Sequence, residues 1–352
     1  MFLPYHIQRV NPIRCTLADI GKSIGLSAST VSLALRNNPR IPRETRARVK
    51  KAAKSLKYRP DPVLSALIAR KNPGRTTRTF ANLGVIIDDR WSLQPHAGEW
   101  VDLVLAGMRG SCSRLGYALE VFYLEKDFGN LREPDRFLYA RGIRGLIIPS
   151  FLEGAPKFKL DWDRYAIVAL GGYPISHGFP RIGTDFFAGM GIVCSELAEL
   201  GYERVGLAHS YQMESTHRFE WHGSLCKETQ MKPKRLTPVP PHLPSVFSKD
   251  SFIRWIERHK PECVISNEPE SLSYLKEAGL RVPKDIGFVS LSTTRFSEKI
   301  TGLLTDYGLL GDLSIMQLHG LLLRGESGMS TQQQETLICQ TWTERGTVRK
   351  MR

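Results

Sequence analysis

The sequence predicts a small all-α domain joined to an α/β body with two doubly wound parallel sheets. Three observations support this fold class. The first 80 residues hold 17 Lys and Arg against three Asp and Glu, whereas residues 81–352 hold 32 of each. Residues 16–57 show helical periodicity, and apolar runs alternate with amphipathic stretches from residue 82 onward. A chain of 352 residues accommodates two or three such domains.

The bulk composition is that of a folded protein that stays where it is made. No run of about 18 apolar residues occurs, so no membrane span is expected. The first 15 residues lack the apolar core of a signal peptide, which favours a cytoplasmic location. The six cysteines are scattered without a CxxC pair, as expected for thiols in a reducing compartment.

The first predicted helix runs from Leu17 to about Ile24. Thr16 and Asp19 have the spacing of a capping box, which places an acid near the positive end of the helix dipole. Gly25 can adopt the positive φ that a tight turn requires. A helix that is capped by Thr16 and broken at Gly25 is therefore expected.

Two more helices follow, over 28–35 after the cap residue Ser27, and from Arg43 to about Lys57. The second is expected to pack through Val31, Ala34 and Leu35. The third is expected to bury Val49, Ala53 and Leu56 and to expose Arg46, Lys50, Lys54 and Lys57. Two short helices around a glycine turn, braced by a third, form a helix-turn-helix unit.

The charge and this pattern together favour nucleic acid as a partner. In a helix-turn-helix unit the first residues of the second helix face base edges in the major groove. Here these residues carry short hydroxyl side chains that can reach bases and phosphates. A solvated basic tail or an ordinary three-helix bundle would explain the charge or the helices alone, but not both.

A short fourth helix is predicted over 63–69. Asp61 is a good N-cap and Pro62 a good first-turn residue. The helix has fewer than three turns and almost no charge, so it should be marginal alone in water. Residues 70–79 then form a basic linker.

Residues 16–67 resemble the N-terminal region of the lactose-repressor (LacI/GalR) family. The matching motifs are T-L-x-D-I, G-L-S-x-S-T-V-S, I-P-x-x-T-R-x-R-V and L-x-Y-x-P. The resemblance implies that residues 63–69 form a hinge helix that folds when two subunits lie together on an operator. Leu67 then stands where the family inserts an apolar wedge into the minor groove. The DNA-contacting residues expected on this basis are Thr16, Leu17, Ser27, Ala28, Ser29, Thr30, Ser32, Leu33, Arg36, Arg40, Thr45, Tyr58, Asp61 and Leu67.

Leu33 departs from the family pattern. The family most often has Arg after the V-S of the second helix, and Arg can grip the O6 and N7 of guanine. Leucine cannot make this contact. Leu33 could instead touch a thymine methyl group, or it could pack within the domain, and the sequence leaves both open.

The body alternates predicted strands and helices, which indicates parallel doubly wound sheets. Strands are expected at 83–87, 119–124, 145–149, 166–170, 205–208, 263–266 and 286–291. Helices are expected at 100–115, 188–200, 217–228 and 269–278. Residues 233–244, rich in proline, are expected to form a surface loop. About 250 residues of this pattern favour two lobes.

The body also resembles the effector domain of the same family, which has the periplasmic-binding-protein fold. The matching segments are 83–87, 116–121, 141–149, 200–207, 282–291 and 301–311. The resemblance implies an N-terminal extension at 1–15, a helix-turn-helix domain at 16–60, a hinge and linker at 61–80, and an effector-binding and dimerisation domain at 81–348. It assigns about 82–183 and 306–333 to one lobe, and about 184–305 and 334–348 to the other.

The resemblance places a ligand in the cleft between the lobes. Arg218 matches an arginine that bonds sugar hydroxyls in relatives, Asn267 matches the Asn of an Asn-Asp pair, and Glu268 replaces the acid of that pair. Thr293 stands where relatives often carry an Asp, and Tyr307 at an aromatic position. These departures favour a carbohydrate-derived or other small polar effector over a standard pentose or hexose. Alternatively, Arg218 and Asn267 only hold the lobes together.

The sequence therefore predicts a regulator, most simply a repressor, that binds a palindromic DNA operator as a homodimer. No enzymatic activity, cofactor or metal is expected: His209, His217 and His222 fit no metal spacing and are expected to be solvated or capping residues. Residues 348–352 are too short for a tetramerising coil. The alternatives are a solute-binding protein with the same body fold, or a regulator of this type with no small-molecule effector.

Overall fold

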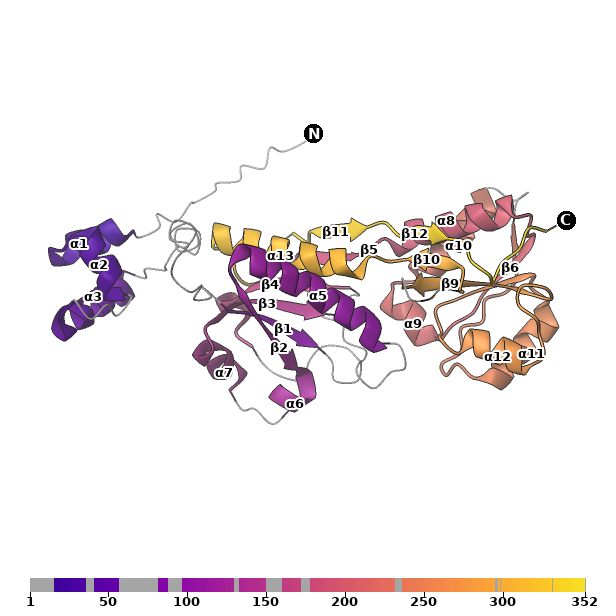
Figure 1. Cartoon of the computed structure of the whole chain (residues 1–352), viewed down its shortest axis with the longest axis horizontal. Helices are drawn as coiled ribbons and strands as arrows, with labels where there is room; N and C mark the ends of the chain where they lie inside the picture. Colours follow the sequence, from indigo (N-terminus) through magenta and orange to yellow (C-terminus); the bar gives the residue numbers. More distant parts are fainter. Residues whose placement is uncertain are drawn as a thin grey trace, which may run out of the picture. The chain divides into compact units, whose positions relative to one another are not determined.

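The computed structural model describes residues 16–35, 41–56, 82–87, 97–129, 133–149, 160–171, 178–231, 236–294, 297, 299–330 and 332–351. The chain divides into two compact units, residues 1–72 and 73–352, and each is considered by itself. We call them the head and the body (Figure 1).

The head contains three helices, α1 (Leu17–Ile24), α2 (Ala28–Leu35) and α3 (Arg43–Ser55). The predicted capping box is confirmed: Asp19 N donates to Thr16 Oγ1 at 3.2 Å, and Thr16 N donates to the Asp19 carboxylate at 2.8 Å. Gly25 ends α1 with φ 71°. Thr30 N donates to Ser27 Oγ at 3.2 Å, so Ser27 caps α2 as predicted.

The core of the head is built from apolar side chains of all three helices. Its fully buried members are Ile20, Val31, Ala34, Val49 and Ala53. Two expectations for α3 were wrong. Leu56 is 39% exposed, because α3 ends at Ser55 and the buried stripe stops one turn earlier. Arg46 is half-buried rather than exposed.

The body contains two six-stranded sheets, which confirms the predicted fold class. The first has the order β11-β5-β4-β3-β1-β2 and is parallel throughout. Its strands are β1 (Asn82–Ile87), β2 (Ala118–Tyr123), β3 (Ile143–Pro149), β4 (Ala166–Leu170), β5 (Arg181–Thr184) and β11 (Glu335–Ile338). The second has the order β12-β10-β9-β8-β6-β7, and β12 is antiparallel to β10. Its strands are β6 (Arg204–Leu207), β7 (Thr237–Pro238), β8 (Cys263–Ser266), β9 (Gly287–Thr293), β10 (Gly302–Leu304) and β12 (Thr341–Thr343).

Helices cover both faces of each sheet, so each lobe has two apolar cores. On the first sheet, α5 (Ala97–Leu115) and α13 (Tyr307–Arg324) lie side by side on one face (Figure 1). The other face carries α6 (Leu124–Phe128), α7 (Pro134–Ala140) and η2 (Trp162–Arg164). The second sheet is covered by α8 (Phe186–Glu199), α9 (Tyr211–Thr216), α10 (Glu220–Met231), α11 (Lys249–His259) and α12 (Ser271–Glu277).

The chain crosses between the two lobes three times, after β5, after β10 and after β11. The last crossing corrects the sequence-based lobe boundaries. Residues from 334 onward were expected in the second lobe, but β11 pairs with β5 over Glu335–Ile338, so the crossing lies at 339–340. Thr184, also expected in the second lobe, ends β5 of the first.

Two other expectations for the body were wrong. The helix expected at 217–228 begins later, as α10 at Glu220, because Arg218 and Phe219 adopt φ of 56° and 59°, and the separate helix α9 before it was not expected. The expected loop at 233–244 contains edge strand β7, which pairs with β6, and a bridge between Ala208 and His242. Among the residues described, no helix is long and apolar enough to cross a membrane.

Candidate functional site

The outer side of α2 is small and uncharged. Ala28, Ser29 and Leu33 are exposed, and Thr30 and Ser32 are half-buried. The hydroxyl of Ser27 lies 2.9 Å from that of Ser29 and 2.8 Å from that of Thr30, so the three form a network at the start of the helix. A helix surface without long side chains allows close approach to another surface.

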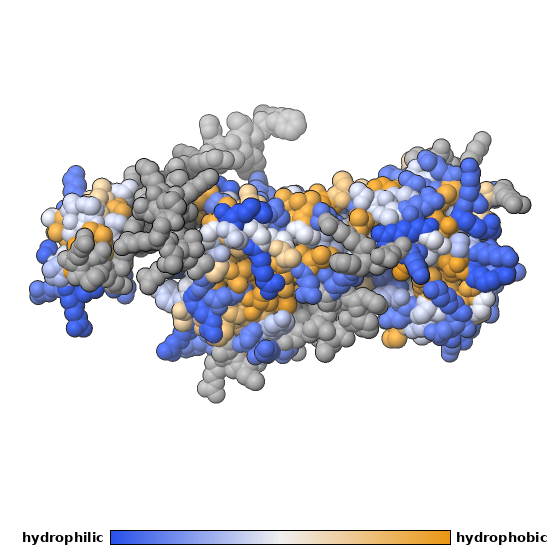
Figure 2. All heavy atoms as spheres, in the orientation of Figure 1, coloured by the Kyte–Doolittle hydropathy of each residue, from blue (hydrophilic) through white to orange (hydrophobic). Residues whose placement is uncertain are grey.

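Beside α2, α3 presents a basic surface. Arg43, Lys50, Lys51 and Lys54 are exposed, and hydrophilic side chains cover the outer side of this helix (Figure 2). Arg48 Nη2 donates to Ile24 O at 3.3 Å, which ties α3 to the end of α1. The head thus combines α2, whose outer side carries small uncharged side chains, with the positively charged α3. Such a pair is suited to contact base edges through α2 and phosphates through α3.

The other predicted contact residues of the head divide into two groups. Thr16 caps α1, and its hydrogen bond lowers the pKa of Asp19, while Leu17 packs on the core and Thr45 is half-buried. Arg36, Arg40, Tyr58, Asp61 and Leu67 lie outside the described residues, so their roles stay predictions.

The cleft that the resemblance implies would lie where the two lobes of the body meet, at the carboxyl ends of the strands. Tyr307, which begins α13 of the first lobe, lies with its hydroxyl 2.5 Å from Ser292 Oγ of β9. Thr294 Oγ1, just after β9, donates to Glu99 Oε1 of α5 at 2.9 Å. Trp100 stands beside Tyr307 with ring centroids 5.9 Å apart. These contacts join the lobes through polar groups around an aromatic pair.

A second interlobe contact involves Arg218. Its Nη1 lies 4.0 Å from Oε1 of Glu335, on β11 of the first lobe. Glu335 also accepts from buried Arg181 at 2.8 Å, so one carboxylate faces two guanidinium groups. The positive φ of Arg218 and Phe219 is rare for residues with side chains, and such strained backbone clusters at functional sites.

The remaining predicted cleft residues also follow strand ends. Asn267, directly after β8, donates to Met213 Sδ at 3.5 Å. Thr293 ends β9 with 1% exposure, and its Oγ1 has no hydrogen-bond partner among the described groups. Burial raises the pKa of Tyr307, so its hydroxyl stays protonated and can donate. The structure therefore places Arg218 and Tyr307 in contacts between the lobes, and Asn267 and Thr293 at the carboxyl ends of β8 and β9.

The chain resembles known transcription regulators in sequence. The family model "Bacterial regulatory proteins, lacI family" matches residues 16–61. The regulator MalR of Streptococcus pneumoniae is 27% identical over 170 residues, 48% of this chain and 49% of that protein. The repressor PurR of Haemophilus influenzae is 22% identical over 311 residues, 80% of this chain and 83% of that protein. Residues 16–61 therefore match the DNA-binding region of the lacI family, and the sequence similarity to regulators of this kind extends into the body. The match of the chain spans about half the length of MalR.

Solved structures share the fold of this chain. The lac repressor dimer bound to operator and an anti-inducer matches 95% of this chain and 99% of its own, with a TM-score of 0.55 and 19% identity. The regulator CcpA of Lactococcus lactis matches 77% of this chain and 100% of its own, with a TM-score of 0.61 and 13% identity. At these identities, the likeness shows the fold alone.

The histidines of the second lobe correct the expectation of solvated or capping residues only in part, because His217 is the C-cap of α9 as expected, whereas His209 is neither solvated nor a cap. His209 and Glu214 are both fully buried, and His209 Nε2 donates to the Glu214 carboxylate, which also accepts from His222 N at 2.9 Å. His217 Nδ1 donates to Met213 O at 2.7 Å, and its ring lies 4.3 Å from that of Trp221. Burial lowers the pKa of His217 to about 4. Among the described residues, no His, Cys, Asp and Glu group could hold a metal.

The sequence did not identify three further residues of the cleft. Glu99 and Trp100 lie in the first turn of α5, where Glu99 accepts a hydrogen bond from Thr294 and Trp100 packs beside Tyr307. Glu335 lies near the guanidinium group of Arg218. Glu268, which departs from the family pattern, also makes a contact here: its Oε1 accepts a hydrogen bond from Ser210 N at 2.7 Å, and Ser210 is the N-cap of α9. No motif distinguishes these residues, because their roles depend on the packing of one lobe on the other.

Proposed function

We propose that the chain is a transcription regulator that binds DNA in a sequence-specific way through its head. The observation that carries this proposal is the bare, uncharged outer side of α2 beside the basic surface of α3. A helix-turn-helix unit places such a helix in the major groove, while lysines and arginines neutralise phosphates. The relatives carry regulator names, which supports regulation rather than catalysis.

The DNA target is an operator with two related half-sites, bound by a homodimer in the cytoplasm. Two-fold symmetry in the protein requires two-fold symmetry in the sequence that it reads. The likeness to a lac repressor dimer bound to operator supports this assembly. Repression is the simplest outcome, because a dimer on an operator blocks access to the DNA.

The body binds a small polar effector between its lobes. The residues that would contact it are Arg218, Asn267, Thr293 and Tyr307. The buried hydroxyl of Thr293 has no hydrogen-bond partner within the described part of the chain, which supports a ligand with a hydrogen-bonding group. Aromatic Trp100 and Tyr307 can pack against a flat or apolar ring face. The effector shifts operator affinity only by its different affinities for two lobe arrangements.

A second candidate is a regulator of the same kind that senses no small molecule. Glu335 accepts from Arg181 and lies near Arg218, and Glu268 is bonded to Ser210 N. Internal pairing of these charges removes groups that a ligand would otherwise bind. The two candidates share the DNA-binding head and differ only in the cleft.

In-vitro selection of duplexes from a random pool, using the full chain, tests the DNA-binding proposal. We expect an inverted repeat that gives a protected footprint covering both half-sites. The same selection with residues 81–352 serves as the control and should enrich nothing. Equal enrichment by both proteins, or no enrichment by the full chain, would refute the proposal.

A further inference from the structure

Leu33 lies outside the packed core of the head. Its side chain is 37% exposed, and it belongs neither to the buried core of the head nor to the half-buried residues packed against it. It follows Ser29 by four residues, so the two share the outer side of α2. Single exposed leucines are common on protein surfaces, so the location of Leu33 matters more than its exposure.

The chemistry of α2 limits how this side can recognise DNA. The helix contains only Ala, Ser, Thr, Val and Leu, without a charged or amide side chain. The hydroxyls of Ser27, Ser29 and Thr30 already bond one another. The described part of this helix therefore offers no pair of donors for guanine and no amide for adenine.

We propose that Leu33 reads the 5-methyl group of a thymine in each operator half-site. This inference rests on the proposed function, in which α2 enters the major groove. Among the four bases, only thymine presents an apolar group there. Over any other base edge, the leucine would cover polar groups without bonding them, which is unfavourable. The basic residues of α3 meanwhile contact phosphates and carry no sequence information.

Replacement of thymine by deoxyuridine tests this inference, because uracil lacks only the methyl group. Each thymine of the selected duplex is replaced in turn, symmetrically in both half-sites, and the affinity of the full chain is measured. We expect one sensitive thymine position in each half-site. At this position each lost methyl group should raise the dissociation constant about fourfold, which corresponds to ~0.8 kcal/mol because a tenfold change is 1.4 kcal/mol.

Three substitutions test whether Leu33 itself makes this contact. Leu33→Ala should bind the thymine and uracil duplexes equally at that position. Leu56→Ala is the matched control, because Leu56 is 39% exposed but lies beyond the end of α3, and it should keep the full sensitivity. Leu33→Arg should select guanine near the same position.

The outcomes distinguish this inference from the proposed function. A full chain that selects no duplex would overturn both. A full chain that selects an inverted repeat but tolerates uracil at every position would overturn only the thymine contact. Sensitivity that persists unchanged in Leu33→Ala would also overturn it.

Discussion

Arg218 Nη1 lies 4.0 Å from Glu335 Oε1, and this contact joins the second lobe of the body to β11 of the first. The arginine that family resemblance assigns to a ligand therefore faces a carboxylate of its own chain. Arg218 is half exposed, so the contact is solvent-screened and weak. A ligand that bonds Arg218 would compete with Glu335 and alter how the lobes meet.

This competition predicts the outcome of a ligand screen by thermal shift. Sugars, sugar acids and nucleosides are tested on the body, residues 81–352. A ligand of the cleft should raise the midpoint of unfolding in the wild type, less in Arg218→Ala and more in Glu335→Gln, because the amide competes less strongly for the guanidinium.

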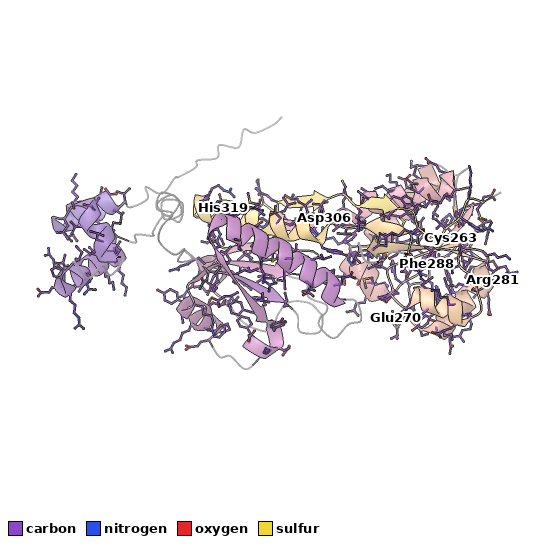
Figure 3. All side chains as sticks on the ribbon, viewed as in Figure 1. Cys263, Glu270, Arg281, Phe288, Asp306 and His319 are labelled. Atoms are coloured by element: carbon purple, nitrogen blue, oxygen red, sulfur yellow. The ribbon has the colours of Figure 1, made fainter. Side chains whose placement is uncertain are left out.

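Arg281→Ala is the control for that screen. Arg281 pairs with Asp285 near the start of β9, at the end of the second lobe away from the cleft (Figure 3). Its loss should leave the ligand-induced shift unchanged. A shift that survives Arg218→Ala undiminished would place the ligand elsewhere, and a screen without hits would favour the regulator that senses no small molecule.

The packing of α5 on α13 predicts opposite effects for two glycines of one helix. A Cβ added at Gly107 would lie 2.0 Å from Gly308 O, whereas one at Gly110 would lie no closer than 3.7 Å to Arg114 Nη1. Gly107→Ala should destabilise the body by ~1–3 kcal/mol through overpacking. Gly110→Ala should stabilise it by up to ~1 kcal/mol, because alanine favours helix. Chemical denaturation measures both, and equal effects would contradict the close helix contact.

Burial of His217 predicts that the body loses stability in mild acid. The folded-state pKa is about 4, below the ordinary value of 6.5, so the unfolded chain binds more protons between these values. The stabilisation is complete above pH 6.5 and is lost as pH falls toward 4. His217→Gln should reduce this slope without removing it, because burial also lowers the pKa of His242 and His319. An unchanged slope in His217→Gln would show that this ring is not shielded from water.

The sequence predicted correctly those elements in which the local pattern of capping, turn and apolar residues agrees with the burial of the element in the fold. The capping box of Thr16 and Asp19, the turn at Gly25 and the apolar strands β1, β4 and β8 all form where the pattern indicated. In each case local preference and tertiary burial agree.

Elements decided by the other parts of the chain were missed. Strands β5 and β11 are short and partly polar, and they become strands because β5 pairs with β4 and β11 pairs with β5. The break between α9 and α10 requires positive φ at Arg218 and Phe219, which neither residue type favours. Periodicity also gives no sign that His209 would be buried against Glu214, because histidine occurs both inside and outside proteins.

The oligomeric state is the next prediction. Analytical ultracentrifugation of the full chain should give a dimer in the absence of DNA, because two heads must be linked to read two half-sites. The isolated body should give the same state. A stable tetramer or a strict monomer at micromolar concentration would contradict the proposed assembly.

The salt dependence of duplex binding tests the central claim most directly, namely that the basic head reads DNA for this chain. The affinity of the full chain for its selected duplex and for a scrambled duplex is measured between 50 and 200 mM salt. We expect both affinities to fall, by ~10³-fold or more if six or more phosphates are neutralised, with the selected duplex bound more tightly throughout. Residues 81–352 should bind neither duplex. Binding that is retained by residues 81–352, or that is equal for the two duplexes at every salt concentration, would contradict the account.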